Sequence, residues 1–321
     1  MVKVLGAKRR LSGARHIASL LGAGTVLLAL TLAAAACGSG SSATTPSANG
    51  KIPVVAAENS WGSIASQLGG NKVALTSIIT NPETDPHDYQ PTAANAGTIA
   101  ASKMVIVNGI GYDPWASKIL STNSSTGPTV LNVGDVLRVP DGGNPHRWYS
   151  PNDVMTIVDT ITADYKKIDP NDAAYFDSQN QAYVTNGLAQ YNQMISQIKA
   201  KYSGVRVGAS ESIFSLLAPA LGLNLVTPDS FLKAVSEGSE PTAADKGTID
   251  SQIKNRQIKV YAYNSQNADP DVQAQVKEAK AAGIPVTTIT ETLTPANLSF
   301  QAWQVRQLQG LANALGKATG Q

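Results

Sequence analysis

The chain has 321 residues, of which 42% are hydrophobic and 15% are charged, and this length is enough for two domains of ordinary size. The formal net charge is +2, but residues 1–36 hold five of the 25 basic residues and no acid, which leaves 20 basic against 23 acidic residues. A mildly acidic chain lacks the basic surface needed to neutralise phosphates, which excludes nucleic-acid binding. The single cysteine, Cys37, excludes a disulfide framework and a zinc site built from paired cysteines.

The N-terminus has the composition of an export signal. Residues 1–16 form a basic region, an apolar run follows from Ile17 to Ala36, and small residues stand directly before Cys37. A cysteine at this place, followed by Gly and Ser, is typical of a bacterial lipoprotein signal, so we predict cleavage before Cys37 and its acylation. A plain secretory signal or a single transmembrane anchor is the alternative. Residues 37–50 are rich in Gly, Ser and Thr and are expected to form a flexible tether.

From Lys51 onward, short apolar runs alternate with amphipathic stretches. The runs expected to form buried strands are 52–57, 73–79, 104–109, 205–210, 223–226, 259–263 and 284–289. Helices are expected between most of them, over 60–68, 113–120, 213–221, 245–257 and 269–282. This alternation predicts an α/β fold of mainly parallel sheets covered by helices. No apolar segment after residue 36 is long enough to span a bilayer.

One segment, 169–203, interrupts the alternation. Asp169 supplies an N-cap, Pro170 suits the first helical position, and apolar residues then recur in steps of three and four as far as Tyr202. The pattern predicts one helix of about 33 residues, roughly 50 Å long. Such a helix is best explained as a rigid connector between a first lobe at 51–168 and a second lobe at 204–321.

The two lobes also share a weak internal repeat. Residues 54–70 and 206–223 each run from a strand through a small polar turn into an amphipathic helix that ends in Leu-Gly. A repeat of this kind is consistent with two related lobes that face each other.

Two histidines remain after the predicted signal, and their surroundings are alike. His87 lies in Asp-Pro-His-Asp-Tyr and His146 in Asn-Pro-His-Arg-Trp. Proline restricts the backbone before each imidazole, so each ring is expected to project from a rigid loop. Both loops should lie at the edge of the first lobe, where open α/β sheets bind ligands. From these residues alone, a shared metal site and two ordinary loop histidines are about equally well supported.

With these motifs the chain resembles the substrate-binding lipoproteins of zinc and manganese ABC transporters, the cluster A-I solute-binding family. The resemblance covers nearly all of residues 52–316 and implies two lobes joined by a single long helix. The motifs that carry it are VVAAENSWGSIASQLGG (54–70), DPHDYQPT (85–92), VNGIGYDPW (107–115), NPHRWYSP (144–151), VGASESIF (207–214), ALGL (220–223) and GIPVTTITETL (283–293). The combination of the two proline-histidine motifs is specific, whereas either motif alone would be a weak signal.

The resemblance also implies a set of metal ligands. In this family two His from the first lobe, and a His or Glu and an Asp or Glu from the second, hold the metal. Carried over by position, the ligands are His87, His146, Glu211 and Glu291. Each of these two carboxylates follows a short apolar strand, so both would project from the same end of one sheet. The competing acids are Glu58, Asp88, Glu237 and Glu240, of which Glu58 is the most serious because it occupies the equivalent turn of the first lobe.

This ligand set leaves the metal open between zinc and manganese. Two neutral imidazoles and two carboxylates bring a charge of −2 to a divalent cation. The stretch between His87 and His146 contains no further His, unlike the His-rich loop that zinc-specific members often carry. Additional oxygen ligands suit Mn²⁺, but the general order of affinities favours Zn²⁺ at nearly any nitrogen and oxygen site, so zinc is slightly preferred.

We therefore expect an exported binding protein, not an enzyme, anchored to the outer face of the bacterial cytoplasmic membrane through lipidated Cys37. It would capture Zn²⁺ or Mn²⁺ between its lobes as a transport substrate and deliver the ion to a membrane permease. The sequence contains no P-loop, so ATP would be hydrolysed by a separate ATPase subunit. The protein is expected to be a monomer, and the connecting helix should limit closure of the lobes to a small rotation or a local rearrangement.

Three alternatives place the same residues in other roles. A binding protein for a metal chelate such as a siderophore would share the architecture, but it would need a basic or aromatic rim. A zinc metallohydrolase would keep an open coordination position, and no HExxH or HxH spacing occurs here. A surface adhesin, as relatives of this family are often labelled, is compatible with metal capture, but nothing in the sequence identifies a host partner.

Overall fold

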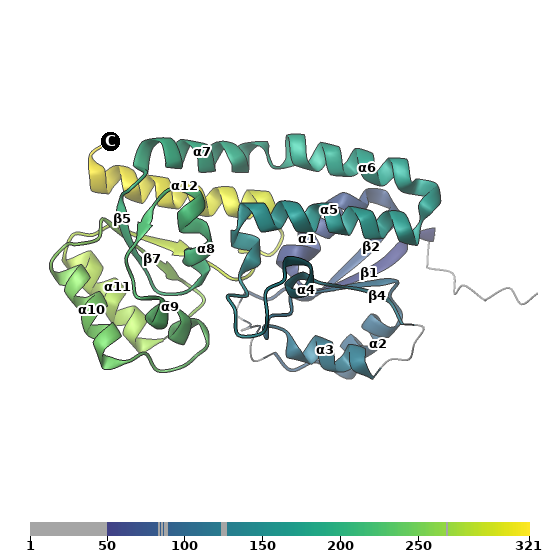
Figure 1. Ribbon diagram of the computed structural model, residues 1–321, viewed down its shortest axis with the longest axis horizontal. Coiled ribbons are helices and arrows are strands. Elements are labelled where there is room, and N and C mark those ends of the chain that lie inside the picture. Colours follow the sequence, from purple (N-terminus) through teal and green to yellow (C-terminus); the bar gives the residue numbers. More distant parts are fainter. Residues whose placement is uncertain (1–49, 83, 85, 87–88, 123–126, 268) are drawn as a thin grey trace, which may run out of the picture. The chain divides into compact units, whose positions relative to one another are not determined.

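The computed structural model describes residues 50–321 apart from 83, 85, 87–88, 123–126 and 268 (Figure 1). The predicted signal, Cys37, nearly all of the tether and the candidate ligand His87 therefore lie outside the described residues. Among the residues described, no helix is both long and apolar enough to cross a membrane.

The first lobe is built on a parallel sheet with strand order β2-β1-β3-β4 within the described residues. Its strands are β1 (Ile52–Glu58), β2 (Val73–Ile79), β3 (Met104–Val107) and β4 (Thr129–Asn132). Val54 of β1 is in register with Leu75 of β2 and with Met104 of β3. The helices of this lobe are α1 (Asn59–Gly69), α2 (Ala93–Ala100), α3 (Pro114–Ser121), α4 (Val133–Leu137) and α5 (Pro151–Ile168), with short 3₁₀ turns at Gly70–Lys72 and Arg147–Tyr149.

The second lobe repeats this topology. Its described strands form a parallel sheet in the order β6-β5-β7-β8. They are β5 (Arg206–Ala209), β6 (Asn224–Leu225), β7 (Val260–Asn264) and β8 (Val286–Ile289). Its helices are α8 (Ile213–Ala220), α9 (Asp229–Ser236), α10 (Ala243–Lys254), α11 (Pro270–Ala281) and α12 (Phe300–Thr319). In both sheets the first strand of the lobe lies inside the sheet and leads into a helix, directly in the first lobe and through the turn 210–212 in the second. The sequence repeat therefore corresponds to a repeat of topology.

The helical connection runs from Pro170 to Tyr202. It begins with a 3₁₀ turn at Pro170–Asp172 and continues as α6 (Ala173–Ala182), a π-helical turn at Tyr183–Gly187, and α7 (Ala189–Tyr202). The predicted connector is thus helical over its expected length, but it is not one uninterrupted α-helix. At Gly187 a β-carbon would lie 3.0 Å from the Tyr183 ring, so the glycine leaves room for this buried ring beside the widened turn.

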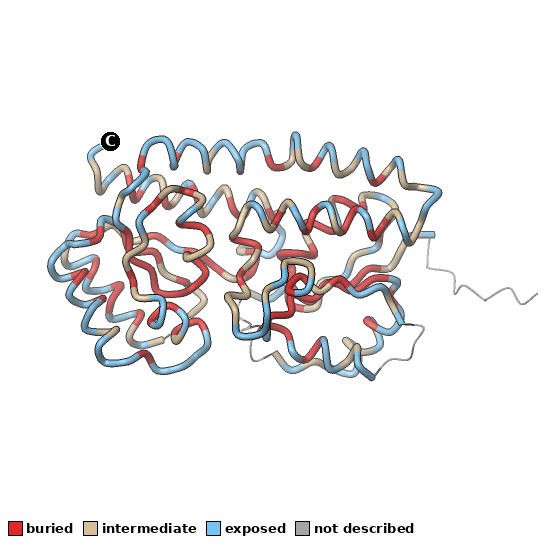
Figure 2. The backbone as a smooth tube through the Cα atoms, in the orientation of Figure 1, coloured by how far each residue is buried: buried red, intermediate tan, exposed pale blue. Residues whose placement is uncertain are grey.

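The apolar core is shared between the lobes, and both belong to one compact unit, Pro46–Gln321. Figure 2 shows buried residues along the central strands and the inner sides of the helices. Along β1 the side chains alternate, with Val54 and Ala56 in the main core and Val55 and Ala57 in a smaller core on the other face of the sheet. The main core also contains Ile157 of α5, Phe214 of α8 and Phe300 of α12, and therefore extends into both lobes.

The predicted fold class is confirmed, and the strand predictions agree with the structure to within a few residues. The chain also forms β4, which the sequence analysis did not predict. Its four residues show little amphipathic pattern because only Leu131 is buried among them. Helices α2, α4, α5, α9 and α12 also lie outside the predicted helical ranges, and α5 and α12 are the longest of them. Each of these two begins where a serine side chain caps the first turn, since Ser150 accepts a hydrogen bond from the Asp153 N–H and Ser299 from the Ala302 N–H.

We expect the metal-free protein to unfold in one cooperative transition, because the main core crosses the boundary between the lobes. Phe300→Ala should lower the free energy of unfolding by about 3 to 5 kcal/mol, because this ring is fully buried against Tyr191 and Trp303. Urea unfolding followed by fluorescence and by circular dichroism tests this, with the exposed Val130→Ala as the control. Two separate transitions in the wild-type protein would contradict a shared core.

Candidate functional site

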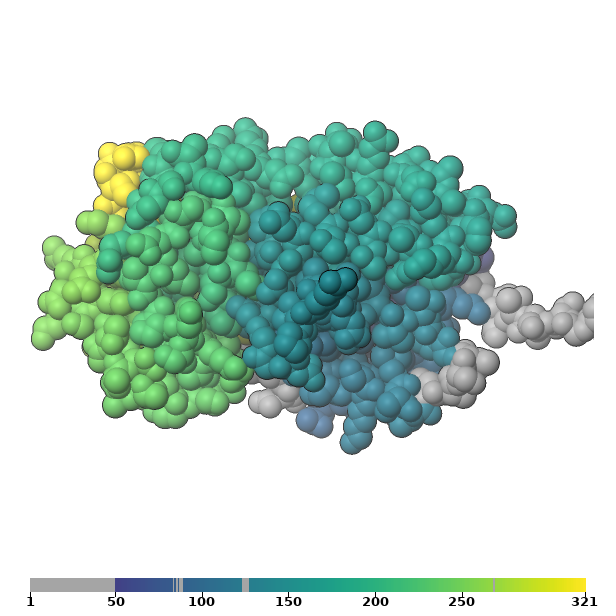
Figure 3. All heavy atoms as spheres, in the orientation of Figure 1, coloured from purple at the N-terminus to yellow at the C-terminus, as the bar shows by residue number. Residues whose placement is uncertain are grey.

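Polar loops at the carboxyl ends of the parallel strands carry the candidate site. In the first lobe these are the loop 108–113 after β3 and the loop 139–146 that leads to His146. In the second lobe they are the turns 210–212 after β5, 264–267 at the end of β7 and 290–292 after β8. Figure 3 shows atoms of the first lobe, blue to teal, lying against green atoms of the second lobe. This arrangement agrees with the general rule that open α/β sheets bind ligands at the carboxyl ends of their strands.

His146 is fully buried, and its ring is held in one orientation. Its Nδ1 lies 3.0 Å from the Asn144 Oδ1 atom, and the Asn144 Nδ2 atom donates to the Ser212 carbonyl at 2.6 Å. That second hydrogen bond fixes which end of the amide faces the ring. Because an amide oxygen only accepts, Nδ1 carries the proton of the neutral ring, and Nε2 keeps the lone pair that a metal requires. Nε2 lies 4.0 Å from the Glu291 Oε2 atom.

Glu211 and Glu291 are joined by one side-chain amide. The Asn264 Nδ2 atom donates to Glu211 Oε2 at 3.1 Å and to Glu291 Oε1 at 3.0 Å. Asn267 donates to the other Glu211 oxygen at 2.7 Å, and Tyr112 of the first lobe donates to Glu291 Oε2 at 2.8 Å. Glu211 is fully buried, so these amide donors replace water around its carboxylate.

Gln266 holds the turn that carries Glu291. Its Oε1 accepts hydrogen bonds from the backbone N–H groups of Glu291 at 2.6 Å and Thr292 at 3.2 Å. Its Nε2 donates to the Pro82 carbonyl of the first lobe at 2.5 Å. Pro82 lies five residues before His87 in the sequence, so Gln266 ties the Glu291 turn to the segment that leads to that histidine.

Tyr149 links the two lobes close to His146. Its hydroxyl donates to the Thr290 carbonyl at 2.7 Å, and the Thr290 N–H is bound by the Gln307 Oε1 atom at 2.8 Å. The side chain is fully buried, and burial raises the pKa of the phenol, so it stays neutral and able to donate. The residue that follows Thr290 is Glu291, so this hydrogen bond connects the loops of His146 and Glu291.

A small cavity of about 190 Å³ opens beside Glu291. The first lobe contributes Pro82, Thr84 and Pro86, and the second lobe contributes Val235, Ser236, Gly238, Asn264, Gln266, Asn267, Asp269 and Glu291. Among the described residues that line the cavity, none is Lys or Arg. The cavity therefore suits a small cation better than a large anionic ligand.

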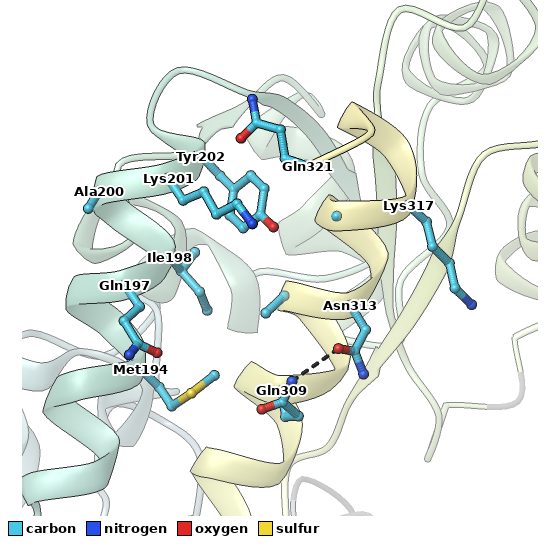
Figure 4. Close-up of a pocket in the computed structure, with 12 residues that line it drawn as sticks. Met194, Gln197, Ile198, Ala200, Lys201, Tyr202, Gln309, Asn313, Lys317 and Gln321 are labelled. Carbon is cyan, nitrogen blue, oxygen red and sulfur yellow. Dashed lines mark hydrogen bonds between the residues drawn. The ribbon is translucent and has the colours of Figure 1, made fainter.

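A larger groove of about 890 Å³ lies between α7 and α12 (Figure 4). Its described lining includes Met194, Ile198, Lys201, Tyr202 and Lys317, and none of the described residues that line it is His, Asp or Glu. In Figure 4 the hydrogen bond from Gln309 to Asn313 runs along the α12 side of the groove. This groove lacks the side chains that bind divalent cations.

Three of the candidate ligands lie near one another, two of them directly side by side and the third through a shared hydrogen-bond donor. His146 and Glu291 lie side by side, and Glu211 joins them through Asn264. His87 lies outside the described residues, and in the part of the chain that is described no three His, Cys, Asp or Glu side chains are close enough together to hold a metal ion.

The competing acids have other surroundings. Glu58 is buried beside Asp113 in the first lobe. Glu237 pairs with Lys233 at 3.6 Å, and the exposed Glu240 pairs with Lys246. Asp88 lies outside the described residues.

Sequence reasoning did not find Asn264, Asn267, Gln266, Tyr112 or Asn144. A usable signal was present, because Asn-x₄-Asp-Pro occurs at 108–114 and again at 264–270. Both copies follow the third strand of their lobe, and in each the Asp-Pro pair begins the next helix, α3 or α11.

The chain belongs to the family described as zinc-uptake complex component A, periplasmic, whose family model matches residues 54–314. It is 26% identical over 164 residues to the manganese-binding lipoprotein MntA of Halalkalibacterium halodurans, which covers 50% of this chain and 53% of that protein. It is 24% identical over 295 residues to the zinc-binding lipoprotein AdcA of Streptococcus pneumoniae, which covers 82% of this chain and 56% of that protein. The chain therefore spans little more than half the length of these two relatives.

Solved structures share the fold. A manganese-bound mutant of a periplasmic metal-binding protein from Candidatus Liberibacter asiaticus matches with a TM-score of 0.70 at 20% identity, covering 83% of this chain and 99% of that one. The periplasmic zinc-binding protein TroA of Treponema pallidum matches with a TM-score of 0.67 at 18% identity, covering 84% of this chain and 99% of that one. At these identities the likeness establishes the two-lobe fold.

Tyr149→Phe should lower the free energy of unfolding by about 1 to 3 kcal/mol, because it leaves a buried carbonyl oxygen of Thr290 without this donor. Urea unfolding of the metal-free protein measures the effect. Tyr202→Phe in α7, whose hydroxyl takes no part in this contact between the lobes, is the matched control and should change stability little. An equal effect of both substitutions would contradict a specific role for the Tyr149 hydroxyl.

Proposed function

We propose that the protein captures a divalent transition metal, zinc or manganese, between its two lobes and delivers it to a membrane permease. The observation that carries this proposal is the distance of 4.0 Å between His146 Nε2 and Glu291 Oε2, beside a cavity lined by both lobes. Glu211 lies within reach of the same point because Asn264 binds both carboxylates. His87 is the proposed fourth ligand.

The proposed donor set suits transport better than hydrolysis. Two imidazoles and two carboxylates would saturate a tetrahedral ion, whereas a catalytic zinc keeps one position for water. We therefore propose a binding protein rather than an enzyme.

Other features argue against a metal chelate as the ligand. A siderophore complex is large and anionic, and the cavity beside Glu291 has neither its size nor a cationic lining. The named relatives include both zinc-binding and manganese-binding lipoproteins, so the proposal keeps both metals. Competition between Zn²⁺ and Mn²⁺, after elemental analysis of protein purified without added metal, would decide between them.

The proposal includes the wider setting of the protein. Residues 1–36 act as a lipoprotein signal, lipidated Cys37 anchors a monomer to the outer face of the cytoplasmic membrane, and residues 37–50 form the tether. The metal-binding lobes are 51–168 and 204–321, joined by 169–203. The partners are an ABC permease and its separate ATPase subunit. Membership of a zinc-uptake family and the lipoprotein names of its relatives support this assignment.

Alanine at each proposed ligand should weaken metal binding by orders of magnitude, because each substitution removes one bond to the ion. The variants are His87→Ala, His146→Ala, Glu211→Ala and Glu291→Ala, measured by competition with a chromophoric chelator. Glu240→Ala is the control, since this exposed acid pairs only with Lys246 among the described ion pairs. Wild-type affinity in Glu291→Ala, together with loss of binding in Glu58→Ala, would move the site into the first lobe.

Cys37→Ser should release the protein from the membrane fraction, because a serine cannot be acylated in place of the only cysteine of the chain. Fractionation followed by mass spectrometry of the N-terminus measures the outcome. A variant that stays in the membrane and keeps residues 1–36 would show a transmembrane anchor instead.

A further inference from the structure

The last residue of β1, Glu58, is a buried acid outside the proposed ligand set. Its side chain lies in the first lobe with 2% of the residue exposed. Neither of its carboxyl oxygens accepts a hydrogen bond from another of the described residues. A buried charge without donors is costly, so an ionised Glu58 would strongly destabilise the fold.

The charged group that faces Glu58 is the carboxyl group of Asp113, which has no exposed surface. Asp113 Oδ2 accepts from the Asn108 N–H at 2.7 Å, and Oδ1 accepts from the Gly109 N–H at 2.8 Å. Among the described ion pairs, none joins a Lys, Arg or His to either acid. Asp113 is therefore placed as the ionised acceptor of the pair, and none of the described cations pairs with Glu58 to balance a second charge.

The loop that Asp113 holds is strained. Gly109, Ile110 and Gly111 have φ values of 67°, 61° and 80°, and this region is unfavourable for a β-branched residue such as Ile110. At Gly109 a β-carbon would lie 2.2 Å from the Asn132 Oδ1 atom, so only glycine fits there. The two hydrogen bonds from Asn108 and Gly109 to Asp113 close this loop and offset its strain.

The pKa shifts of the two acids also agree with one proton held between them. Burial, and then the negative charge of Asp113, raise the pKa of Glu58 well above its usual value of 4.5. Burial also raises the pKa of Asp113, while the hydrogen bonds from Asn108 and Gly109 act in the opposite direction. These effects favour the proton on Glu58 and the charge on Asp113.

We propose that Glu58 is a positioning residue that stays protonated at neutral pH, donates its proton in a hydrogen bond to Asp113, and so fixes the loop 108–113 next to the metal site. The proton is not transferred, and no bond other than this hydrogen bond forms or breaks. Glu58 acts through Asp113 and is not itself a metal ligand.

The loop 108–113 is hydrogen-bonded to groups around the proposed metal site. Its Tyr112 hydroxyl donates to Glu291 Oε2 at 2.8 Å, and its Asn108 side chain donates to the Pro145 carbonyl, directly before His146, at 3.0 Å. Asn108 also accepts from the Trp61 Nε1 atom at 2.9 Å. The effect on metal binding rests on the proposed function, whereas the protonation of Glu58 does not.

The second lobe shows the contrasting case at its equivalent turn. Glu211 follows β5 as Glu58 ends β1, but the amide groups of Asn264 and Asn267 donate hydrogen bonds to its two carboxylate oxygens. Amide donors stabilise a carboxylate ion, and a neighbouring carboxylate disfavours one. The equivalent turns of the two lobes thus hold acids with different hydrogen-bonding surroundings.

Stability against pH in the metal-free protein tests the protonation directly. Well below pH 4.5, the usual pKa of the group, Glu58 is protonated in both the folded and the unfolded chain, and its contribution to stability is fully present. As the pH rises, the unfolded chain loses this proton while the folded chain keeps it, so stability falls until the pH passes the raised folded pKa. Glu58→Gln has no proton to lose at this position and keeps a donor for Asp113.

We therefore expect the urea midpoint of Glu58→Gln, relative to that of the wild type, to increase as the pH rises from about 5 to about 8. Infrared spectra of the wild-type protein at neutral pH should also show the carbonyl stretch of a protonated carboxylic acid, and Glu58→Gln should lack it. Midpoints that stay parallel over this range, or a wild-type spectrum without that band, would overturn the proposal.

Measurements of Zn²⁺ affinity then distinguish a positioning role of Glu58 from a role as a metal ligand. Glu58→Gln should bind Zn²⁺ within a factor of about two of the wild type, whereas Glu58→Ala, which cannot donate to Asp113, should bind roughly 10-fold more weakly. Equal affinities in Glu58→Ala and Glu58→Gln would overturn the link to the site. If His146→Ala also binds Zn²⁺ like the wild type, the proposed function is contradicted. The stability and infrared measurements still test whether Glu58 stays protonated, because they do not depend on metal binding.

Discussion

The buried carboxylate of Glu211 sets the arrangement of the face between the lobes, because a charge out of water needs donors on both oxygens. Those donors are Asn264 and Asn267, which end β7 and begin the turn that follows it. Asn264 also binds Glu291 after β8. One amide thus couples the carboxyl ends of neighbouring strands, and the position of each carboxylate depends on the other.

The connection between the lobes restricts how far they can move. The main core contains residues of both lobes, and hydrogen bonds from Asn144 to Ser212 and from Tyr149 to Thr290 cross the boundary beside His146. Helix α12 adds a further link, since the Phe300 N–H donates to Ser63 in α1. Wide hinge closure would break these contacts, so capture of an ion is expected to proceed through local rearrangement of the loops.

Much of the fold could be predicted from sequence because buried parallel strands appear as apolar runs between turns, as in 104–109 and 259–263. The half-exposed β4 and the widened turn at Tyr183–Gly187 could not, because they depend on edge pairing and on space beside a buried ring. Of the site, His146 and the two second-lobe acids came from motif position and family resemblance. The amides of Asn144, Asn264 and Gln266 act through contacts distant in sequence, and side-chain type alone does not reveal them.

The most direct test of the account is a crystal structure of the zinc-loaded protein with anomalous diffraction at the zinc edge. We predict one strong peak between the lobes, about 2.0 to 2.2 Å from His146 Nε2 and from carboxylate oxygens of Glu211 and Glu291, with His87 completing the shell. A peak bound by Glu58 and Asp113, or zinc found only at scattered surface positions, would contradict it.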